Sequence, residues 1–249
     1  MSIVLPPEYR VVVIGAGSGI GRAAARHLAA LGCRVAALDL DEAAAAETAL
    51  GHGGIVCSVR LDVTDAVGAR LGLAAAREAL GGIDAVANCA GITGRTTVKV
   101  VDVDLADFDL VYRINLLGAL IVSQAVLPRM IEQGFGRLLH VASIAGKDGN
   151  AGMAAYSASK AGLIGLVKVM GKEYAEAGVT INALAPAVIQ TPMVEALPEA
   201  QVRYMTDKIP MKRTGTLDEI SQMIAWIISP ACSFTTGFTF DLSGGRAVY

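Results

Sequence analysis

The feature that most constrains this chain is a β-branched run that enters a glycine-rich turn. Residues Arg10–Ile14 predict a buried strand, and an alanine-rich amphipathic segment over 22–31 predicts a helix. The turn between them holds Gly15, Gly17, Gly19 and Gly21. Such a turn lets the backbone approach a pyrophosphate, and the helix N-terminus offers free N–H groups. The pattern predicts a dinucleotide site, although a glycine turn without a ligand has the same sequence.

Short apolar runs recur along the chain and alternate with helical segments. Beyond Arg10–Ile14, strands are expected at residues 34–39, 55–61, 83–87, 137–142, 179–184 and 238–242. Strands that alternate with helices imply right-handed crossovers and a mostly parallel sheet. With 249 residues, 53% of them hydrophobic, the chain can bury a large core. We therefore expect a single α/β domain over 1–249, with a Rossmann-type, doubly wound, seven-stranded sheet and helices on both faces.

Composition limits the kinds of partner and the cellular location that we expect for this protein. The formal net charge of −2 gives no reason to expect a nucleic-acid partner. The cysteines at 33, 57, 89 and 232 form no Cys-x-x-Cys pair, so we expect no metal site and reduced thiols in the cytoplasm. The N-terminus lacks the basic and apolar pattern of a secretory signal. The least polar stretch, 114–127, is short and contains polar residues, so it predicts a buried helix and no membrane span.

Asp39 ends the second expected strand and bears on the choice of dinucleotide. A carboxylate at this point accepts hydrogen bonds from the adenosine ribose hydroxyls and repels a 2′-phosphate. No Arg or Lys follows it immediately, and Ser18 occupies the turn position where a basic residue would meet that phosphate. The sequence therefore predicts NAD as the cofactor in preference to NADP. Alternatively, Asp39 merely caps the helix expected to begin near Asp41.

Tyr156 and Lys160 are four residues apart and share one face of an expected helix. A cation one turn from a phenol favours the phenolate, so Lys160 is expected to lower the pKa of Tyr156 from its usual value of about 10. Tyr156 would then serve as an acid and a base, and Ser143, at the end of the 137–142 strand, would orient a substrate oxygen. Taken alone, Tyr-x-x-x-Lys is common on amphipathic surface helices.

Further polar residues stand at or just past the ends of predicted strands. Asp62 and Asn88 follow the third and fourth strands, and Pro186 follows the sixth. Ligands of such sheets bind beyond the carboxyl ends of the strands, so these residues are expected near the glycine turn. Asn115 lies inside a long apolar helix expected over 105–133, where its amide is costly to bury unless it is hydrogen-bonded.

In order and spacing, these residues resemble the short-chain dehydrogenase/reductase family over nearly the whole chain. Gly15-x-x-x-Gly19-x-Gly21 resembles the family's cofactor turn, and Asn88-x-Ala90-Gly91 resembles the motif that steadies its central strand. The resemblance implies a catalytic tetrad of Asn115, Ser143, Tyr156 and Lys160. It implies cofactor contacts by Gly15, Ser18, Gly19, Ile20, Gly21, Asp39, Leu40, Asp62, Val63, Asn88, Ala90, Gly91, Tyr156, Lys160, Pro186, Ile189 and Thr191.

Within the tetrad, the resemblance implies that Lys160 also binds the nicotinamide ribose and that Asn115 holds a water connecting Lys160 to solvent. Three positions depart from the family pattern. Ile14, Cys89 and Ala187 stand where threonine, asparagine and glycine are usual. The first two change local hydrogen bonds near the cofactor, and the third restricts the backbone after Pro186.

The resemblance implies reversible hydride transfer between a secondary alcohol or ketone and a nicotinamide. The chain end over 240–249 resembles members that oxidise sugars, sugar acids or polyols, which favours a small hydroxylated substrate. The whole pattern also resembles 3-oxoacyl-(acyl-carrier-protein) reductases, but Asp39 disfavours their usual NADPH, and Arg129 and Lys172 are too isolated for a carrier-protein site. A NAD-sensing protein without turnover is the non-enzyme alternative, and the intact tetrad argues against it.

Substrate contacts are assigned by position only, to Ser143, Ile144, Ala145, Asn150, Met153, Tyr156 and Met193. Asn150 has a side chain able to hydrogen-bond a substrate hydroxyl, but the role of an ordinary loop asparagine is favoured for it. Residues from about 191 to 213 are expected to form a mobile flap over the site. The helices around Asn115 and after Tyr156 are more apolar than a lone subunit requires. In the family such faces pair, so the resemblance implies a homo-oligomer, with a tetramer as the expected assembly.

Overall fold

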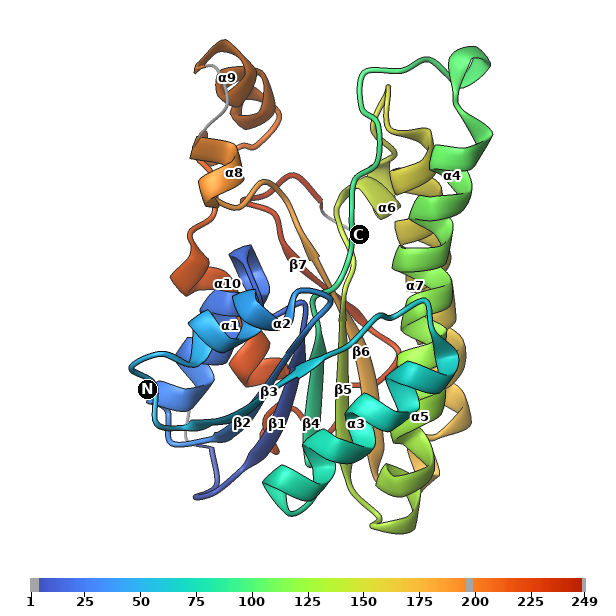
Figure 1. Ribbon diagram of the computed structural model, residues 1–249. Coiled ribbons are helices and arrows are strands. Elements are labelled where there is room, and N and C mark those ends of the chain that lie inside the picture. Colours follow the sequence, from blue (N-terminus) through green and yellow to red (C-terminus); the bar gives the residue numbers. More distant parts are fainter. Residues whose placement is uncertain (1–4, 196–198, 248–249) are drawn as a thin grey trace.

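The computed structural model describes residues 5–195 and 199–247, without the side chains of residues 192, 193, 200 and 201. One sheet of seven parallel strands runs through them in the order β3-β2-β1-β4-β5-β6-β7 (Figure 1). The strands are β1 (Arg10–Ile14), β2 (Arg34–Asp39), β3 (Ile55–Arg60), β4 (Ala85–Asn88), β5 (Gly136–Val141), β6 (Val179–Pro186) and β7 (Thr239–Leu242). The predicted Rossmann-type fold is confirmed. Its strand order reverses between β1 and β4, which is where such sheets bind ligands.

Helices cover both faces of the sheet, as Figure 1 shows. One core lies against α3 (Ala66–Leu80), α5 (Gly118–Glu132) and α7 (Ala154–Glu173). The other lies against α1 (Gly19–Ala30), α2 (Glu42–Ala49) and α10 (Leu217–Ile227). The remaining helices are α4 (Leu105–Tyr112), α6 (Ala145–Asp148), α8 (Pro192–Glu195) and α9 (Glu199–Asp207), with short turns η1 (Val100–Asp102) and η3 (Ala175–Ala177).

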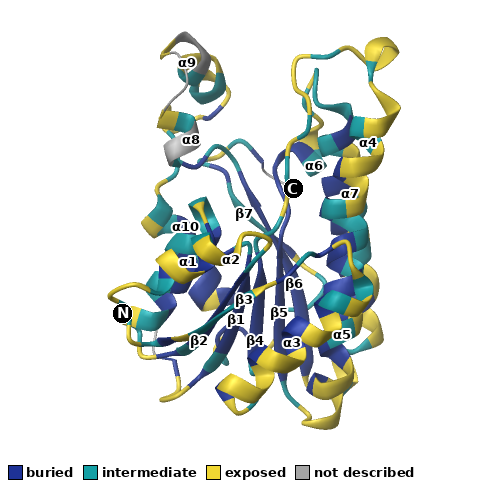
Figure 2. Cartoon of the chain, viewed as in Figure 1, coloured by how far each residue is buried: buried dark blue, intermediate teal, exposed yellow. Residues whose placement is uncertain are grey.

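The first strand shows why its β-branched sequence suits the centre of this sheet. Val12 and Ile14 pack into the first core, whereas Val11 and Val13 pack into the second, because successive side chains of a strand point to opposite faces. A parallel strand with helices on both sides is buried on both faces and needs a continuous apolar run. Figure 2 shows the consequence, a sheet of buried strands inside helices whose outer faces are exposed.

The long helix expected over 105–133 is present, but it contains a π-helical turn, η2 (Arg113–Leu117), between α4 and α5. The combined run Leu105–Glu132 has 28 residues, and its most apolar window has a mean hydropathy of 1.7, so by length and composition alone it is able to cross a membrane. Half of its most apolar window is buried in this fold, where α5 forms part of the first core. The whole run therefore matches the expected helix in length, it is longer than the apolar stretch 114–127 considered from the sequence, and its apolar side chains pack against the sheet.

Several boundaries differ from those expected. β4 starts at Ala85 and not at Ile83, because Asp84 precedes the strand and its side chain accepts a hydrogen bond from the Arg10 backbone N–H at 2.9 Å. β6 continues to Pro186, which pairs with Leu242 of β7. The segment expected to be a flap contains α8 and α9, so much of it is helical. Its residues 196–198 lie outside the described residues, and its mobility stays a prediction.

Candidate active site

The glycine turn after β1 is packed so closely that side chains have no room at two positions. A Cβ at Gly21 would lie 2.0 Å from the Gly15 carbonyl oxygen, and a Cβ at Gly15 would lie 2.8 Å from the Ala90 nitrogen. Gly15 also has φ of +76°, a conformation that glycine adopts without strain. These glycines bring the N-terminus of α1 against the turn after β4. The resulting surface is backbone, which is what close approach of a phosphate group requires.

A cavity of about 530 Å³ lies beside this turn, at the point where the strand order reverses. The predicted cofactor residues that line it are Gly15, Ser18, Gly19, Ile20, Gly21, Asp39, Leu40, Asp62, Val63, Ala90, Gly91 and Thr191. Residues that line it without having been assigned as contacts are Ile14, Leu61, Cys89, Ile92 and Ile114. Each of these adjoins a motif residue along the chain, and adjacency is the one signal that could have found them.

Asp39 faces the glycine turn from the end of β2. Its Oδ2 accepts a hydrogen bond from the Gly17 backbone N–H at 2.7 Å, and its Oδ1 accepts one from the Asp41 N–H at 3.0 Å. The N-cap of α2 is Asp41, whose Oδ1 accepts from the Ala44 N–H at 3.1 Å. The reading of Asp39 as a mere helix cap is therefore wrong. Its half-buried carboxylate stands at the edge of the cavity.

Asn88 does not line the cavity but anchors the turn that does. Its Oδ1 accepts from the Ala90 N–H at 3.2 Å, and its Nδ2 lies 3.1 Å from His140 Nδ1. His140 Nε2 lies 3.0 Å from Ser123 Oγ, which donates to the Ala119 carbonyl at 2.8 Å. Since the Ser123 proton is used, His140 must donate from Nε2 and accept at Nδ1. Burial lowers the pKa of His140 to about 3, which keeps this ring neutral.

Four other predicted cofactor residues also lie outside the cavity wall, namely Tyr156, Lys160, Pro186 and Ile189. The Ile189 side chain is buried in the second core. Pro186 ends β6, and its carbonyl accepts a hydrogen bond from the Ile144 N–H at 3.0 Å. Through this bond the end of β6 holds the segment that follows Ser143. Any contact of Pro186 and Ile189 with a cofactor would therefore come from their backbone or from a small part of the side chain.

The three reactive residues of the predicted tetrad come together past the ends of β5 and β6. Tyr156 is half-buried in the first turn of α7 and is hydrogen-bonded to Ser143, which follows β5. Lys160 lies one turn later, with its Nζ 5.7 Å from the centroid of the Tyr156 ring. That ammonium is buried and donates to the Val141 carbonyl at 2.7 Å. A phenol, a hydroxyl and an amine thus converge at one point.

The pKa values differ from the sequence expectation. Burial raises the pKa of Tyr156 above its usual value, and the hydrogen bond from Ser143 opposes this rise only in part. Lys160 was expected to lower the pKa of Tyr156, but here its ammonium points to the Val141 carbonyl. Burial lowers the pKa of Lys160 itself to about 8. The amine is therefore the group of this pair that releases a proton most readily.

Asn115 lies in the π-helical turn and is buried. Its Oδ1 accepts from the Ile92 N–H and its Nδ2 donates to the Ile92 carbonyl, both at 2.9 Å. Its Nδ2 also lies 3.0 Å from Ser159 Oγ. The buried amide is thus fully used, as its apolar setting required. It joins the loop after Gly91 to α7, and its expected contact with a water stays a prediction.

The predicted substrate residues have mixed placements. Ile144 and Ala145 are buried, and the Met193 side chain lies outside the described residues. Asn150 Oδ1 accepts a hydrogen bond from Arg246 Nη2 at 2.6 Å, so the carbonyl of its amide is already occupied. Asn150 Nδ2 is 3.9 Å from the Met153 sulfur. These contacts favour a structural role for Asn150.

Two ion pairs that the sequence did not reveal lie in the segment after Ser143. Lys147 Nζ is 2.8 Å from Asp241 Oδ2, and Arg246 Nε is 3.1 Å from Asp148 Oδ2. The side chains of Lys147 and Arg246 are only 10% and 11% exposed. The pairs join α6 to the end of β7 and to the chain that follows it. No local pattern signals them, because the partners are more than ninety residues apart.

The residues around the cavity fit a dinucleotide. The closely packed turn leaves backbone facing the cavity, and a carboxylate stands at the end of β2, where an adenosine ribose would lie. A Rossmann-type sheet with such a cavity beside a serine, a tyrosine and a lysine defines an oxidoreductase that uses a nicotinamide cofactor. The comparisons agree: the family model described as Enoyl-(Acyl carrier protein) reductase matches residues 15–247. The chain belongs to the short-chain dehydrogenase/reductase family.

Curated relatives cover nearly the full length. The chain is similar to the 2-dehydro-3-deoxy-L-rhamnonate dehydrogenase (NAD(+)) of Sphingomonas sp. (strain SKA58), with 42% identity over 96% of this chain and 95% of the relative. It is 36% identical to a 3-oxoacyl-[acyl-carrier-protein] reductase of Thermotoga maritima, over 95% and 97% of the two chains. The solved structure of gox2181 superimposes with a TM-score of 0.93 at 31% identity, covering 99% of this chain and 98% of that one. The protein is a dehydrogenase of this family that acts on CH–OH groups.

Proposed function

We propose that the protein is a NAD-dependent dehydrogenase that oxidises a secondary alcohol of a small hydroxylated compound, such as a sugar acid, a sugar or a polyol. The observation that carries the cofactor choice is the Asp39 carboxylate, hydrogen-bonded at the glycine turn where a 2′-phosphate would have to lie. The relative with 42% identity is named as a NAD(+)-dependent enzyme of a deoxy sugar acid, which supports both the cofactor and the substrate class.

Each residue of the tetrad has a distinct part in this chemistry. Bound NAD⁺ supplies the hydride acceptor. Tyr156 takes the proton of the substrate hydroxyl, and Ser143 donates a hydrogen bond that polarises the substrate oxygen. Lys160, one turn along α7 from Tyr156, accepts or returns the proton that the pair exchanges with solvent and binds the cofactor ribose. Asn115 holds the loop after Gly91 against α7 and so keeps the cofactor cavity beside this pair.

The polar character of the segment after Ser143 supports a hydroxylated substrate. Both ion pairs, Lys147 with Asp241 and Arg246 with Asp148, are largely buried there. Buried charges are costly unless they are paired, and the presence of these pairs makes the segment beside Ser143 polar. A long acyl chain would need an apolar channel in their place. A 3-oxoacyl-(acyl-carrier-protein) reductase is the second candidate, supported by the Thermotoga maritima relative.

A substrate screen with NAD⁺ and NADP⁺ in parallel tests the proposal. We expect turnover with NAD⁺ on sugar acids or polyols and at least tenfold less with NADP⁺, about the effect of one repulsive charge. Turnover confined to NADPH with 3-oxoacyl thioesters would establish the second candidate instead. Tight NAD binding, measured by cofactor fluorescence, without turnover on any compound would point to the sensing protein.

We further propose a homo-oligomer, a tetramer in the manner of the family, located in the cytoplasm. Large apolar side chains are exposed on and before α4, with Val101 88% and Leu105 81% exposed, and these surfaces would be covered by a second copy. The four cysteines are free, which suits a reducing compartment. A molar mass measured by light scattering that equals one chain at micromolar concentration would contradict the assembly.

A further inference from the structure

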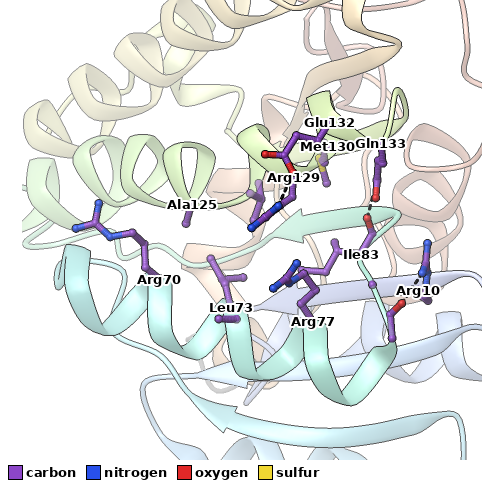
Figure 3. Close-up of a pocket in the computed structure, with 14 residues that line it drawn as sticks. Arg10, Arg70, Leu73, Arg77, Ile83, Ala125, Arg129, Met130, Glu132 and Gln133 are labelled. Carbon is purple, nitrogen blue, oxygen red and sulfur yellow. Dashed lines mark hydrogen bonds and ion pairs between the residues drawn. The ribbon is translucent and has the colours of Figure 1, made fainter.

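A second cavity, of about 580 Å³, lies at the other end of the sheet from the cofactor cavity (Figure 3). Arg10, the first residue of β1, and Ile83, just before β4, lie at its margin, and α3 and α5 form its walls. Four arginines line it, namely Arg10, Arg70, Arg77 and Arg129. They come from three separate elements, so no local sequence pattern reveals the cluster.

The arginines differ in how their charge is compensated. Arg10 is held by Asp84, with Nη2 at 2.6 Å from Oδ1, and it donates to the Gly81 carbonyl. Arg129 pairs with Glu132 on the exposed surface of α5. Within the part of the chain that the structure describes, the guanidinium groups of Arg70 and Arg77 have no hydrogen-bond or ion-pair partner. Glu132 is the one acidic residue among the described residues that line the cavity, and with Arg10 held by Asp84 the wall keeps the positive charges of Arg70 and Arg77 uncompensated.

An ordinary role for such arginines is to neutralise the negative ends of helices, and Arg77 and Arg129 do lie in the last turns of α3 and α5. Here, however, the helix ends have other partners. The Gly82 N–H donates to the Arg77 carbonyl, and the Phe135 N–H donates to the Met130 carbonyl. The Gly81 N–H donates to the Glu78 carbonyl, and the Gln133 N–H donates to the Arg129 carbonyl. The guanidinium groups of Arg77 and Arg129 are therefore not needed as helix caps.

In Figure 3, Arg77 of α3 and Arg129 of α5 extend toward each other across the cavity. Arg77 has no partner among the described residues, and Arg129 is paired only with the exposed Glu132, so an anion between the two side chains would meet one free and one surface-paired guanidinium group. Guanidinium groups bind carboxylate and phosphate oxygens with paired hydrogen bonds. The inner wall is apolar, formed by Leu73, Val126 and Met130, all buried. The cavity thus combines a cationic rim with an apolar floor.

We propose that this arginine cavity is a second ligand site, for an organic anion that carries two or more phosphate or carboxylate groups on an apolar body. Arg77 and Arg129 grip the anionic groups from opposite walls, Arg70 adds charge at the rim, and the apolar body rests on Leu73, Val126 and Met130. The site is distinct from the active site, because it lies at the amino end of the strands and the cofactor cavity lies at their carboxyl ends.

Calorimetric titration tests this proposal, with NAD saturating so that the glycine turn is already filled. Phenylene 1,3-bisphosphate and benzene-1,3-dicarboxylate are the probes, because each carries two anionic groups on the same apolar ring and they differ only in the kind of anionic group, and benzyl alcohol is the neutral control. We expect both anions to bind, benzyl alcohol not to bind, and affinity to fall as salt is added. Whichever anion binds more tightly identifies the ligand as phosphorylated or carboxylated.

Variants locate the site. Arg77→Gln and Arg129→Gln should each weaken anion binding about tenfold, the worth of one charge-assisted hydrogen bond. Arg77→Lys keeps the charge but loses the paired donors, so it should fall between wild type and Arg77→Gln. Lys172→Gln, which removes an exposed charge from α7, should bind as wild type does. Equal affinity in wild type and in the Arg77→Gln/Arg129→Gln double variant, or no binding by wild type, would overturn the proposal.

Discussion

Two tyrosines lie at opposite ends of the sheet, and they differ in what their hydroxyl groups face. Tyr9, just before β1, is buried and donates to the Ile228 carbonyl at 2.8 Å. Tyr156, past the ends of the strands, is half-buried and meets the Ser143 hydroxyl, with the Lys160 amine nearby. Burial raises the pKa of both phenols. Burial therefore does not make a tyrosine reactive, whereas a partner that both gives and takes a proton does.

The same contrast holds for the two ends as a whole. At the carboxyl end, glycines and short loops present backbone groups to a cavity, so its shape is fixed by the fold. At the amino end, long arginine side chains from three elements line a cavity, so the ligands that this cavity favours depend on the charge of those side chains. Five changes test this division, each paired with a matched change elsewhere where the chain offers one.

Replacement of the two tyrosines gives the largest expected difference. Tyr156→Phe should lower kcat about 10²- to 10⁴-fold, the usual contribution of general acid–base catalysis, with little change in NAD affinity. Tyr9→Phe leaves the Ile228 carbonyl without its donor and should cost about 1–3 kcal/mol of unfolding free energy without lowering kcat. Steady-state kinetics and thermal unfolding measure both. Similar loss of kcat in the two variants would remove the distinction between the ends.

Glycine-to-alanine substitutions at the two ends of the sheet should differ in their effect on NAD affinity nearly as strongly. Gly21→Ala places a Cβ 2.0 Å from the Gly15 carbonyl oxygen and must open the turn, whereas Gly53→Ala, before β3, meets nothing within 4 Å. Overpacking of this kind costs about 1–3 kcal/mol, so NAD affinity should fall about ten- to a hundredfold in the first variant. Gly53→Ala should bind NAD as wild type does. NAD affinity is measured by cofactor fluorescence titration. Unchanged affinity in Gly21→Ala would show that the cofactor does not bind at this turn.

The pH dependence should reveal the reactive pair. Burial lowers the pKa of Lys160 to about 8, so the Tyr156–Lys160 pair sheds its first proton near that pH. Alcohol oxidation needs the deprotonated pair, so kcat/KM should rise about tenfold per pH unit below this value and then level off, while ketone reduction should decline above it. In Lys160→Met the rise should move to higher pH, because burial keeps the pKa of Tyr156 raised. A flat profile in wild type would argue against the pair.

Cofactor choice should change more modestly. Asp39→Asn keeps an oxygen to accept from the Gly17 N–H but removes the charge, so the preference for NAD over NADP should fall roughly tenfold. Asp84→Asn, at the amino end, weakens the hold on Arg10 and should leave that preference unchanged. The ratio of kcat/KM for the two cofactors is the measurement. An unchanged ratio in Asp39→Asn would mean that the carboxylate does not face the ribose.

The smallest expected effect concerns the hydrogen-bond chain through His140. His140→Leu leaves Asn88 Nδ2 and Ser123 Oγ without their shared partner, which should cost about 1–3 kcal/mol of stability. NAD affinity should fall severalfold as well, because Asn88 holds the turn at Ala90 that lines the cofactor cavity. Ser123→Ala should show a weaker form of both effects. Loss of stability with unchanged NAD affinity would show that His140 stabilises the core without helping to position the cofactor cavity.

Much of the fold and of the active site followed from the sequence, because both depend on local patterns. The bounds of β1 and β2 were predicted correctly, since both are short apolar runs that end directly at a glycine or an aspartate. Most predicted cofactor residues line the cavity because they follow strand ends, which a parallel sheet gathers at one edge. The placements of Tyr156, Lys160 and Ser143 follow from helix spacing and from the end of β5.

What the sequence did not show depends on contacts between distant residues. The Lys160 ammonium points to the Val141 carbonyl because it donates a hydrogen bond to it. The Asn150 amide oxygen is occupied by Arg246, which lies near the end of the chain. The arginine cavity joins residues from β1, α3 and α5. The π-helical turn around Asn115 has no signal in the apolar sequence, because its cause is the pairing of the Asn115 amide with Ile92 and Ser159.

The π-helical turn limits which insertions and deletions the chain can accept. A π-helical turn behaves as one residue inserted into an α-helix, and one residue corresponds to about 100° of rotation. Deleting a single codon within Arg113–Leu117 would restore a regular helix but swing α4 around its axis relative to α5. Asn115 would then lose either Ile92 or Ser159. We expect length changes to be tolerated in the surface loops of this chain and to be rejected in this one stretch.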